Sequence, residues 1–261
     1  MSRISEAFRN LRAAGRRGFI PYITVGDPDL DTSRALVVEL ARAGATLIEL
    51  GVPFSDPVAD GPTIQRAAER ALRQGVGLDD VLSTLAEARR ETDVPVILFS
   101  YFNPLLQFGL ERLADECARA GVDGILATDL VPEESADFNA VLARRGLDQI
   151  FLVAPTTSDA RLRMIAERAS GFVYAVSRAG VTGAREQLSD EAERLVTRVR
   201  RVSELPVAVG FGISTAAQVA DVWAYADAAV VGSALVSEIE KQAGSPDLVA
   251  RVGAFARALR P

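Results

Sequence analysis

Short apolar runs alternate with longer amphipathic stretches along the whole chain. The runs are rich in β-branched residues, which is typical of buried strands. Eight of them are expected as strands: Phe19–Val25, Leu47–Leu50, Val94–Ser100, Gly124–Thr128, Gln149–Val153, Gly171–Val176, Pro206–Phe211 and Ala228–Val231. The stretches between them have helical apolar spacing, and several begin at Ser, Asp or Thr and end at Gly, as helices do. The segment after Asp60 predicts two helices, divided at Gly75–Gly77.

This alternation predicts a parallel sheet whose outer face is covered by helices. Eight strands in 261 residues favour the closed (β/α)₈ arrangement, a TIM barrel, over an open doubly wound sheet. The glycine-rich nucleotide fingerprint that an open sheet often carries after its first strand is absent. Because no linker interrupts the pattern, we expect residues 1–261 to form a single TIM-barrel domain.

The N-terminal segment predicts an extra helix before the first strand. Ile4, Phe8 and Leu11 fall on one face of it, and arginines fall on the other. It has neither the apolar core of a signal peptide nor a small-residue cleavage site. We therefore expect a cytoplasmic protein.

The composition of the chain excludes several kinds of partner and of chemistry. Hydrophobic residues make up 49% of the chain and charged residues 25%, and no apolar run is long enough to cross a membrane. The net charge is −6 and the basic residues are scattered, so no nucleic-acid partner is expected. There is no histidine, and Cys117 is the single cysteine, which excludes an internal disulfide and most zinc sites. The single lysine, Lys241, lies in a polar helical stretch and is poorly placed to form an imine.

One acidic residue interrupts an apolar strand. Glu49 lies between Ile48 and Leu50. Burying a carboxylate there costs free energy, so it indicates either a function or a partner that compensates for the lost water. The turn that follows carries Asp60, so two acidic residues lie near one strand end. In a chain without histidine, such carboxyl groups are the candidates for general acid/base catalysis. Burial should raise the pKa of Glu49. Both residues also have a structural interpretation: Glu49 as an acid paired with arginine or backbone donors, and Asp60 as a turn or helix cap.

Glycine-rich loops follow the last two expected strands, with the sequences VGFGIST and VVGSALVSEI. Glycines let backbone N–H groups approach an anion, and a serine at a helix start adds a donor. In barrels these two loops commonly bind phosphate. The alternative is that the glycines end the strands for steric reasons alone. A third segment, SRAGVTGAREQ at residues 177–187, predicts either a lid over the substrate or an exposed turn.

Taken in order, these segments resemble the alpha subunit of tryptophan synthase. The resemblance spans essentially the whole chain and is carried by PYITVGDP, ELGVPFSDPVADGPTIQ, NPLLQFG, FLVAPTTS, SRAGVTG, GFGIST and VGSALV. It implies a carbon–carbon lyase of tryptophan biosynthesis that cleaves indole-3-glycerol phosphate to indole and glyceraldehyde 3-phosphate. It also implies a β-subunit partner in an α₂β₂ heterotetramer, which receives the indole through an internal tunnel. PLP would belong to that partner, and no cofactor is expected on this chain.

The resemblance also assigns roles to individual positions. Glu49 aligns with the family's catalytic acid/base and Asp60 with the aspartate that binds the indole N–H. The substrate-binding positions are Tyr174 near the glycerol moiety, Gly183, Gly212, Gly232 and Ser233 at the phosphate, Phe211 beside them and Thr182 on the lid. Asp56 and Pro57 lie on the loop that faces the β subunit in the family.

Three features depart from the family pattern. Tyr22 stands where many members have phenylalanine, and Ser100 stands where a larger apolar residue often lines the indole pocket. After the fourth strand, ATDLVPEE replaces the more usual proline-containing version. These changes leave the shape of the pocket and the turnover open, but the expected reaction stays the same.

The composition fits a retro-aldol cleavage in which the substrate supplies the electron sink. Enzymes usually supply a lysine imine or a metal ion, and this chain has poor candidates for both. Protonation of the indole C3 carbon can serve instead. We expect Glu49 to deliver that proton and to remove the proton of the glycerol hydroxyl, while Asp60 stabilises charge at the indole nitrogen.

Three other functions remain open from the sequence. The first is a stand-alone lyase that releases free indole without a β partner. The second is a non-catalytic subunit that binds ligand and only regulates its partner. The third is another phosphate-binding barrel enzyme, such as a phosphosugar isomerase.

Overall fold

The structure of the protein is a computed structural model that describes residues 2–176, 190–210 and 212–261. Within these residues, eight parallel strands close into a barrel in sequence order, and β1 pairs with both β2 and β8. The strands are β1 Gly18–Thr24, β2 Ile48–Gly51, β3 Val96–Ser100, β4 Gly124–Ala127, β5 Asp148–Val153, β6 Val173–Val176, β7 Val207–Gly210 and β8 Ala228–Val231. The expected TIM barrel is confirmed, and each strand end lies within two residues of the sequence prediction.

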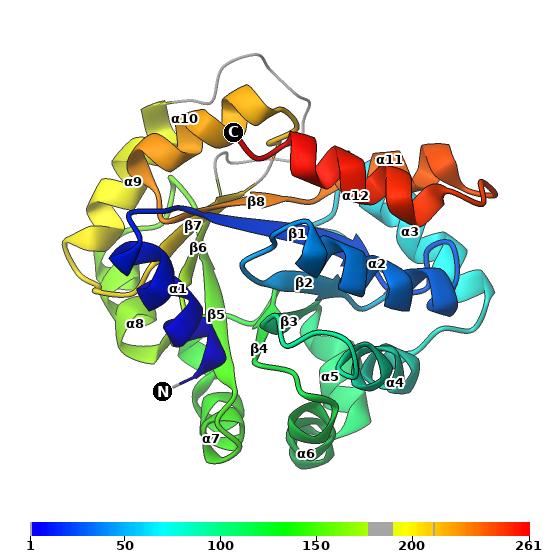
Figure 1. The fold of residues 1–261 in the computed structure, drawn as a ribbon. Helices are drawn as coiled ribbons and strands as arrows, with labels where there is room; N and C mark the ends of the chain where they lie inside the picture. Colours follow the sequence, from blue (N-terminus) through cyan, green and yellow to red (C-terminus); the bar gives the residue numbers. More distant parts are fainter. Residues whose placement is uncertain (1, 177–189, 211) are drawn as a thin grey trace.

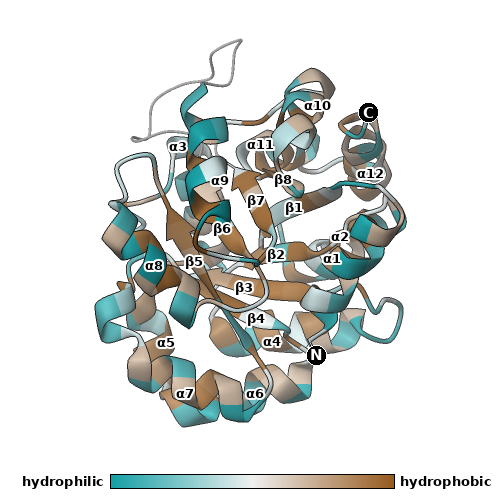
Figure 2. Cartoon of the chain, turned by 90° about the vertical axis from the view of Figure 1, so that its left-hand side faces the viewer, coloured by the Kyte–Doolittle hydropathy of each residue, from teal (hydrophilic) through white to brown (hydrophobic). Residues whose placement is uncertain are grey.

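Helices surround the barrel, which lies in the middle of Figure 1. They are α2 Leu30–Arg42, α3 Pro62–Arg73, α4 Leu78–Ala88, α5 Phe102–Phe108, α6 Leu110–Ala120, α7 Ala136–Arg144, α8 Asp159–Arg168, α9 Asp190–Arg200, α10 Ala216–Tyr225, α11 Ser233–Gln242 and α12 Leu248–Ala258, with a short 3₁₀ helix at Pro132–Glu134. The predicted division after Asp60 is confirmed, because α3 ends before Gly75 and α4 begins after Gly77. Figure 2 shows brown strands inside helices such as α6 and α7, which alternate between teal and brown.

Alternate residues of each strand point to opposite faces, and this divides the core into two layers. The outer layer lies between strands and helices and includes Phe19, Leu36 and Leu98. The inner layer fills the barrel itself. Its strand residues are Ile20, Tyr22, Ile97, Phe99, Leu126, Ile150, Tyr174, Ala208, Ala228 and Val230. Side chains therefore fill the barrel, so a substrate has to bind at its mouth.

The predicted N-terminal helix, α1 Arg3–Ala13, closes the end of the barrel where the strands begin. Ile4 and Phe8 join the inner layer, and the rings of Phe8 and Phe172 lie 5.7 Å apart between centroids. Figure 1 shows this helix in dark blue beside β5 and β6. Because this end is covered, the loops that follow the strands are left to form the site. None of the helices in the described segments combines the length and apolar character of a membrane span.

Candidate active site

Glu49 lies on β2 and is buried inside the barrel. It pairs in register with Tyr22 of β1 on one side and Ile97 of β3 on the other. The residue is 1% exposed, and in the described part of the chain its Oε1 atom has no hydrogen-bond partner. An acid held by arginine or backbone donors would show such a partner, so this geometry does not favour the structural interpretation of Glu49. Burial raises the pKa of the carboxyl well above its ordinary value.

Asp60 lies between β2 and α3 and is half-buried. The hydroxyl of Tyr101 donates a hydrogen bond to Asp60 Oδ2 at 3.0 Å. Burial raises the pKa of Asp60 to about 6, and the hydrogen bond from Tyr101 acts in the opposite direction. The N-cap of α3 is Gly61 and has no side-chain cap bond, so Asp60 is not a helix cap.

Tyr101 follows β3 and organises the loop that carries Asp60. Its hydroxyl oxygen accepts a hydrogen bond from the backbone N–H of Ala59 at 2.9 Å. Its ring packs against Phe54 with a centroid distance of 5.1 Å. Sequence reasoning missed this residue. The available signal was a tyrosine at the end of a strand whose neighbour carries the two acids.

Helix α3, which begins just after Asp60, is anchored by Arg70. The guanidinium Nε lies 2.7 Å from Asp27 Oδ1 in the loop after β1, and Nη1 lies 2.7 Å from Glu240 Oε1 on α11. The Asp27 carboxylate is almost fully buried, which makes the ion pair less exposed to solvent screening than most surface pairs. Arg70, in the last turn of α3, therefore fixes this helix relative to the loop after β1 and to α11.

Two buried tyrosines approach Glu49 from other strands. A Cβ atom on Gly51 would lie 2.1 Å from the hydroxyl oxygen of Tyr22, and one on Gly210 would lie 2.1 Å from that of Tyr174. Only glycine leaves room for the two rings at these positions. Burial, and next the charge of Glu49, raise the pKa of Tyr174, so its hydroxyl stays protonated near the acid. Tyr174 was expected at the site, and the structure brings it there.

The expected phosphate positions lie at the same edge of the barrel, after β7 and β8. Gly212 has a left-handed φ of 85°. Helix α11 begins at Ser233 with Gly232 as its N-cap, no side-chain cap bond and no acidic residue in its first turn. By contrast, α10 is capped by the side chain of Thr215. The uncapped start of α11 is therefore suited to an anion.

Three expected substrate positions, Thr182, Gly183 and Phe211, lie outside the described residues, as does the expected lid segment at 177–187. The loop positions Asp56 and Pro57 lie between Glu49 and Asp60 in the chain. Asp56 is exposed, and the backbone N–H of Asp60 donates to the carbonyl of Pro57 at 3.0 Å.

Ser100 is buried at the end of β3, next to Tyr101. The Ser100 hydroxyl donates to the backbone carbonyl of Tyr101 at 3.0 Å, and its neighbour Phe99 is the residue of β3 in the inner layer. The rings of Phe99 and Tyr22 meet edge to face with a centroid distance of 5.4 Å. Successive residues of a strand point to opposite faces, so only one of the pair can line the barrel.

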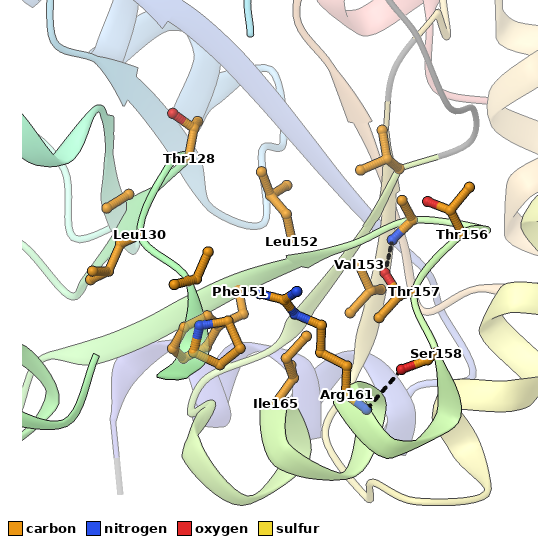
Figure 3. Close-up of a pocket in the computed structure, with 15 residues that line it drawn as sticks. Thr128, Leu130, Phe151, Leu152, Val153, Thr156, Thr157, Ser158, Arg161 and Ile165 are labelled. Carbon is orange, nitrogen blue, oxygen red and sulfur yellow. Dashed lines mark hydrogen bonds between the residues drawn. The ribbon is translucent and has the colours of Figure 1, made fainter. Parts of the chain in front are cut away.

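The segment ATDLVPEE contributes to a cavity of about 400 Å³ over the ends of β4 and β5 and beside α8 (Figure 3). Thr128 and Leu152 lie on one side of it and Arg161 on the other. Neither Glu49 nor Asp60 lines this cavity. Leu152 also packs against the inner layer, so the cavity borders the mouth of the barrel without containing the acids.

The described residues contain no group of three or more His, Cys, Asp or Glu that could hold a metal ion. Lys241 is exposed on α11, with its Nζ 3.3 Å from Glu238 Oε2. Cys117 is buried on α6, and burial raises the pKa of its thiol to about 12. The arrangement instead offers two carboxyl groups whose surroundings differ, the usual requirement for a proton donor beside an ionised acid.

Comparison with known proteins identifies the family. The family model for the tryptophan synthase alpha chain matches residues 8–260. The chain belongs to this family. A tryptophan synthase alpha chain of Roseiflexus sp. (strain RS-1) is 51% identical over 261 residues, which cover 100% of both chains. One from Geobacter sp. (strain M21) is 49% identical over 260 residues, which cover 100% of this chain and 97% of the relative.

Solved structures agree with this membership. Tryptophan synthase subunit alpha from Legionella pneumophila str. Paris superposes with a TM-score of 0.92 at 37% identity, covering 100% of this chain and 97% of that chain. The aminoacrylate-bound form of tryptophan synthase from M. tuberculosis contains a chain with a TM-score of 0.88 at 39% identity, and each chain is covered in full. The expected activity is thereby confirmed: the chain is the lyase of tryptophan biosynthesis that cleaves indole-3-glycerol phosphate.

Replacing Tyr101 with phenylalanine should raise the pKa of Asp60 above its value of about 6. The hydrogen bond from Tyr101 stabilises the ionised carboxylate, so its loss favours the protonated form. Titration of the Asp60 side-chain carboxyl by carbon-13 NMR measures the shift. Tyr225, which is half-buried and remote from Asp60 in the chain, provides Tyr225→Phe as a control with no expected change. An Asp60 pKa that stays the same or falls in Tyr101→Phe would refute this role.

Proposed function

We propose that Glu49 is the proton donor and acceptor of the lyase reaction and that Asp60 stabilises the cation formed on the indole ring. The observation that carries this assignment is the pair of environments at the end of β2. Glu49 is fully buried and has an oxygen without a partner in the described part of the chain, whereas Asp60 is half-buried and hydrogen-bonded to Tyr101. The first environment favours a neutral acid and the second favours a carboxylate at neutral pH.

The reaction balances with these groups alone. Protonated Glu49 gives its proton to the C3 carbon of the indole ring, which leaves a positive charge shared with the ring nitrogen. The Glu49 carboxylate then takes the proton of the hydroxyl on the adjacent chain carbon. The oxygen–hydrogen electrons form the aldehyde, the carbon–carbon bond breaks, and its electrons neutralise the ring. Glu49 ends protonated, and ionised Asp60 stabilises the intermediate cation.

We further propose that the phosphate of the substrate binds at the rim formed by Gly212, Gly232 and Ser233. The support is the start of α11, where backbone N–H groups and the Ser233 hydroxyl are available at a helix N-terminus without a side-chain cap or an acidic residue.

We assign no cofactor to this chain, because the substrate ring accepts the electrons. Since α1 packs into the inner layer of the barrel, we also propose that the whole chain forms one domain. Membership of a biosynthetic enzyme family supports the further proposal of a cytoplasmic location.

We propose that the β subunit, which would hold PLP, docks on the face formed by the loop with Asp56 and Pro57 and by α5, in an α₂β₂ assembly. This face is unusually apolar for its exposure: Val58 is 81% exposed and Leu106 is 49% exposed. A cavity of about 430 Å³, lined in part by Pro53, Phe54 and Phe108, lies beside it. The carbonyl of Pro57 accepts a hydrogen bond from the backbone N–H of Asp60, so contact of the β subunit with this loop would affect the position of Asp60.

Glu49→Gln should lower kcat for indole release by about 10²–10⁴, the usual contribution of a general acid/base, while substrate still binds. Glutamine keeps the shape of the side chain but cannot exchange the proton. Indole formation from indole-3-glycerol phosphate measures the rate, and calorimetry measures binding. Glu91→Gln, at an exposed surface position, is the matched control with unchanged turnover. Normal turnover in Glu49→Gln would overturn the assignment.

Leu106→Glu should weaken association with a tryptophan synthase β subunit at least tenfold, because it places a charge in an apolar contact. Titration of the lyase rate with purified β subunit measures this effect. Val131→Glu, at an exposed apolar position outside the proposed face, should leave association unchanged. Equal association by both variants would reject this face. A wild-type lyase rate that does not respond to the β subunit would favour the stand-alone lyase instead.

A further inference from the structure

Tyr22 lies at the site but has no role in the steps above. It is buried on β1, directly opposite Glu49 in the pairing with β2. Its ring meets Phe99 edge to face, with an interplanar angle of 81°. A phenylalanine would fill this space equally well, so packing alone does not account for the hydroxyl.

The side chain of Tyr22 runs from the proposed phosphate rim toward the acids. A Cβ atom on Gly232 would lie 3.6 Å from the Cβ atom of Tyr22, which places the root of the side chain beside the start of α11. At the other end, the hydroxyl lies over Gly51, two residues after Glu49. A substrate with its phosphate at Gly232 and its reacting carbon at Glu49 has to extend its three-carbon chain along this side chain.

The hydroxyl of Tyr22 contacts Thr24 and can still form a second hydrogen bond. It lies 3.3 Å from Thr24 Oγ1, a long contact between two hydroxyl groups, and Thr24 is itself buried. A tyrosine hydroxyl can donate one hydrogen bond while it accepts another. Burial, and then the charges of Asp60 and Glu49, raise the pKa of Tyr22, so the group remains a donor throughout the working pH range.

We propose that the Tyr22 hydroxyl, oriented by Thr24, donates a hydrogen bond to the second hydroxyl of the glycerol phosphate chain. The first hydroxyl, on the carbon that becomes the aldehyde, gives its proton to Glu49. The second hydroxyl lies between that carbon and the phosphate, beside the side chain of Tyr22. The inference rests on the proposed function, and it makes Tyr22 a residue that recognises the polyol chain and positions the reacting carbon.

Tyr22→Phe should lower kcat/KM for indole-3-glycerol phosphate by about 5- to 50-fold, because the substrate hydroxyl then loses its partner in a buried site. The decisive comparison is the inhibition constant of indole-3-propyl phosphate, which keeps the indole and the phosphate but lacks both chain hydroxyls. That constant should change by less than about twofold, since the probe never makes the bond. Retained inhibition also shows that the variant is folded.

Thr24→Val, which removes a hydroxyl without changing the shape of the side chain, should give the same pattern with a smaller loss. Tyr225→Phe removes a buried hydroxyl without a hydrogen-bond partner in the described residues, and is the control with no expected loss. Equal weakening of substrate and probe in Tyr22→Phe would mean that the ring only shapes the pocket and would overturn the inference, as would an unchanged kcat/KM. Absence of indole release by the unmodified protein would contradict the proposed function itself, and the inference with it.

Discussion

The carboxyl of Glu49 is desolvated inside the barrel, and the chemistry of the site depends on this constraint. An ionised carboxylate in an apolar interior is expensive unless charges or donors compensate for lost water. Burial is the cause of its raised pKa, and in the described part of the chain its Oε1 atom has no hydrogen-bond partner. The neutral acid is therefore the favoured form. Asp60, half-buried and bonded to Tyr101, ionises more easily. Two similar side chains thus acquire different protonation states on one rim.

The barrel makes this arrangement rigid. Glu49 lies on a strand that is paired on both sides, so the backbone at this position is fixed and the carboxyl can move only by rotation of its side chain. Glycines at 51 and 210 admit the two tyrosine rings that fill the space around it. Asp60 is on a loop, but Tyr101 and the ion pairs of Arg70 hold that loop and the helix after it. The opposite end of the barrel is closed by α1, which confines function to the mouth.

Much of this could be predicted from the sequence, because the determining signals are local. Apolar runs and capping residues define the strands and helices, and an acid inside an apolar run identifies Glu49. Contacts between distant segments could not be predicted. Tyr101 and Asp60 are 41 residues apart and meet only in the closed barrel. The choice between Phe99 and Ser100 depends on strand orientation, which a continuous apolar run does not reveal. Likewise, only the folded helix shows that Gly61 is its cap.

Difference infrared spectroscopy between the protein and its Glu49→Gln variant tests the central claim most directly. At pH 7 the account predicts the carbonyl band of a neutral carboxylic acid from Glu49, replaced by carboxylate bands only at higher pH. Carboxylate bands at pH 7, with titration near the ordinary glutamate pKa of about 4.3, would contradict it.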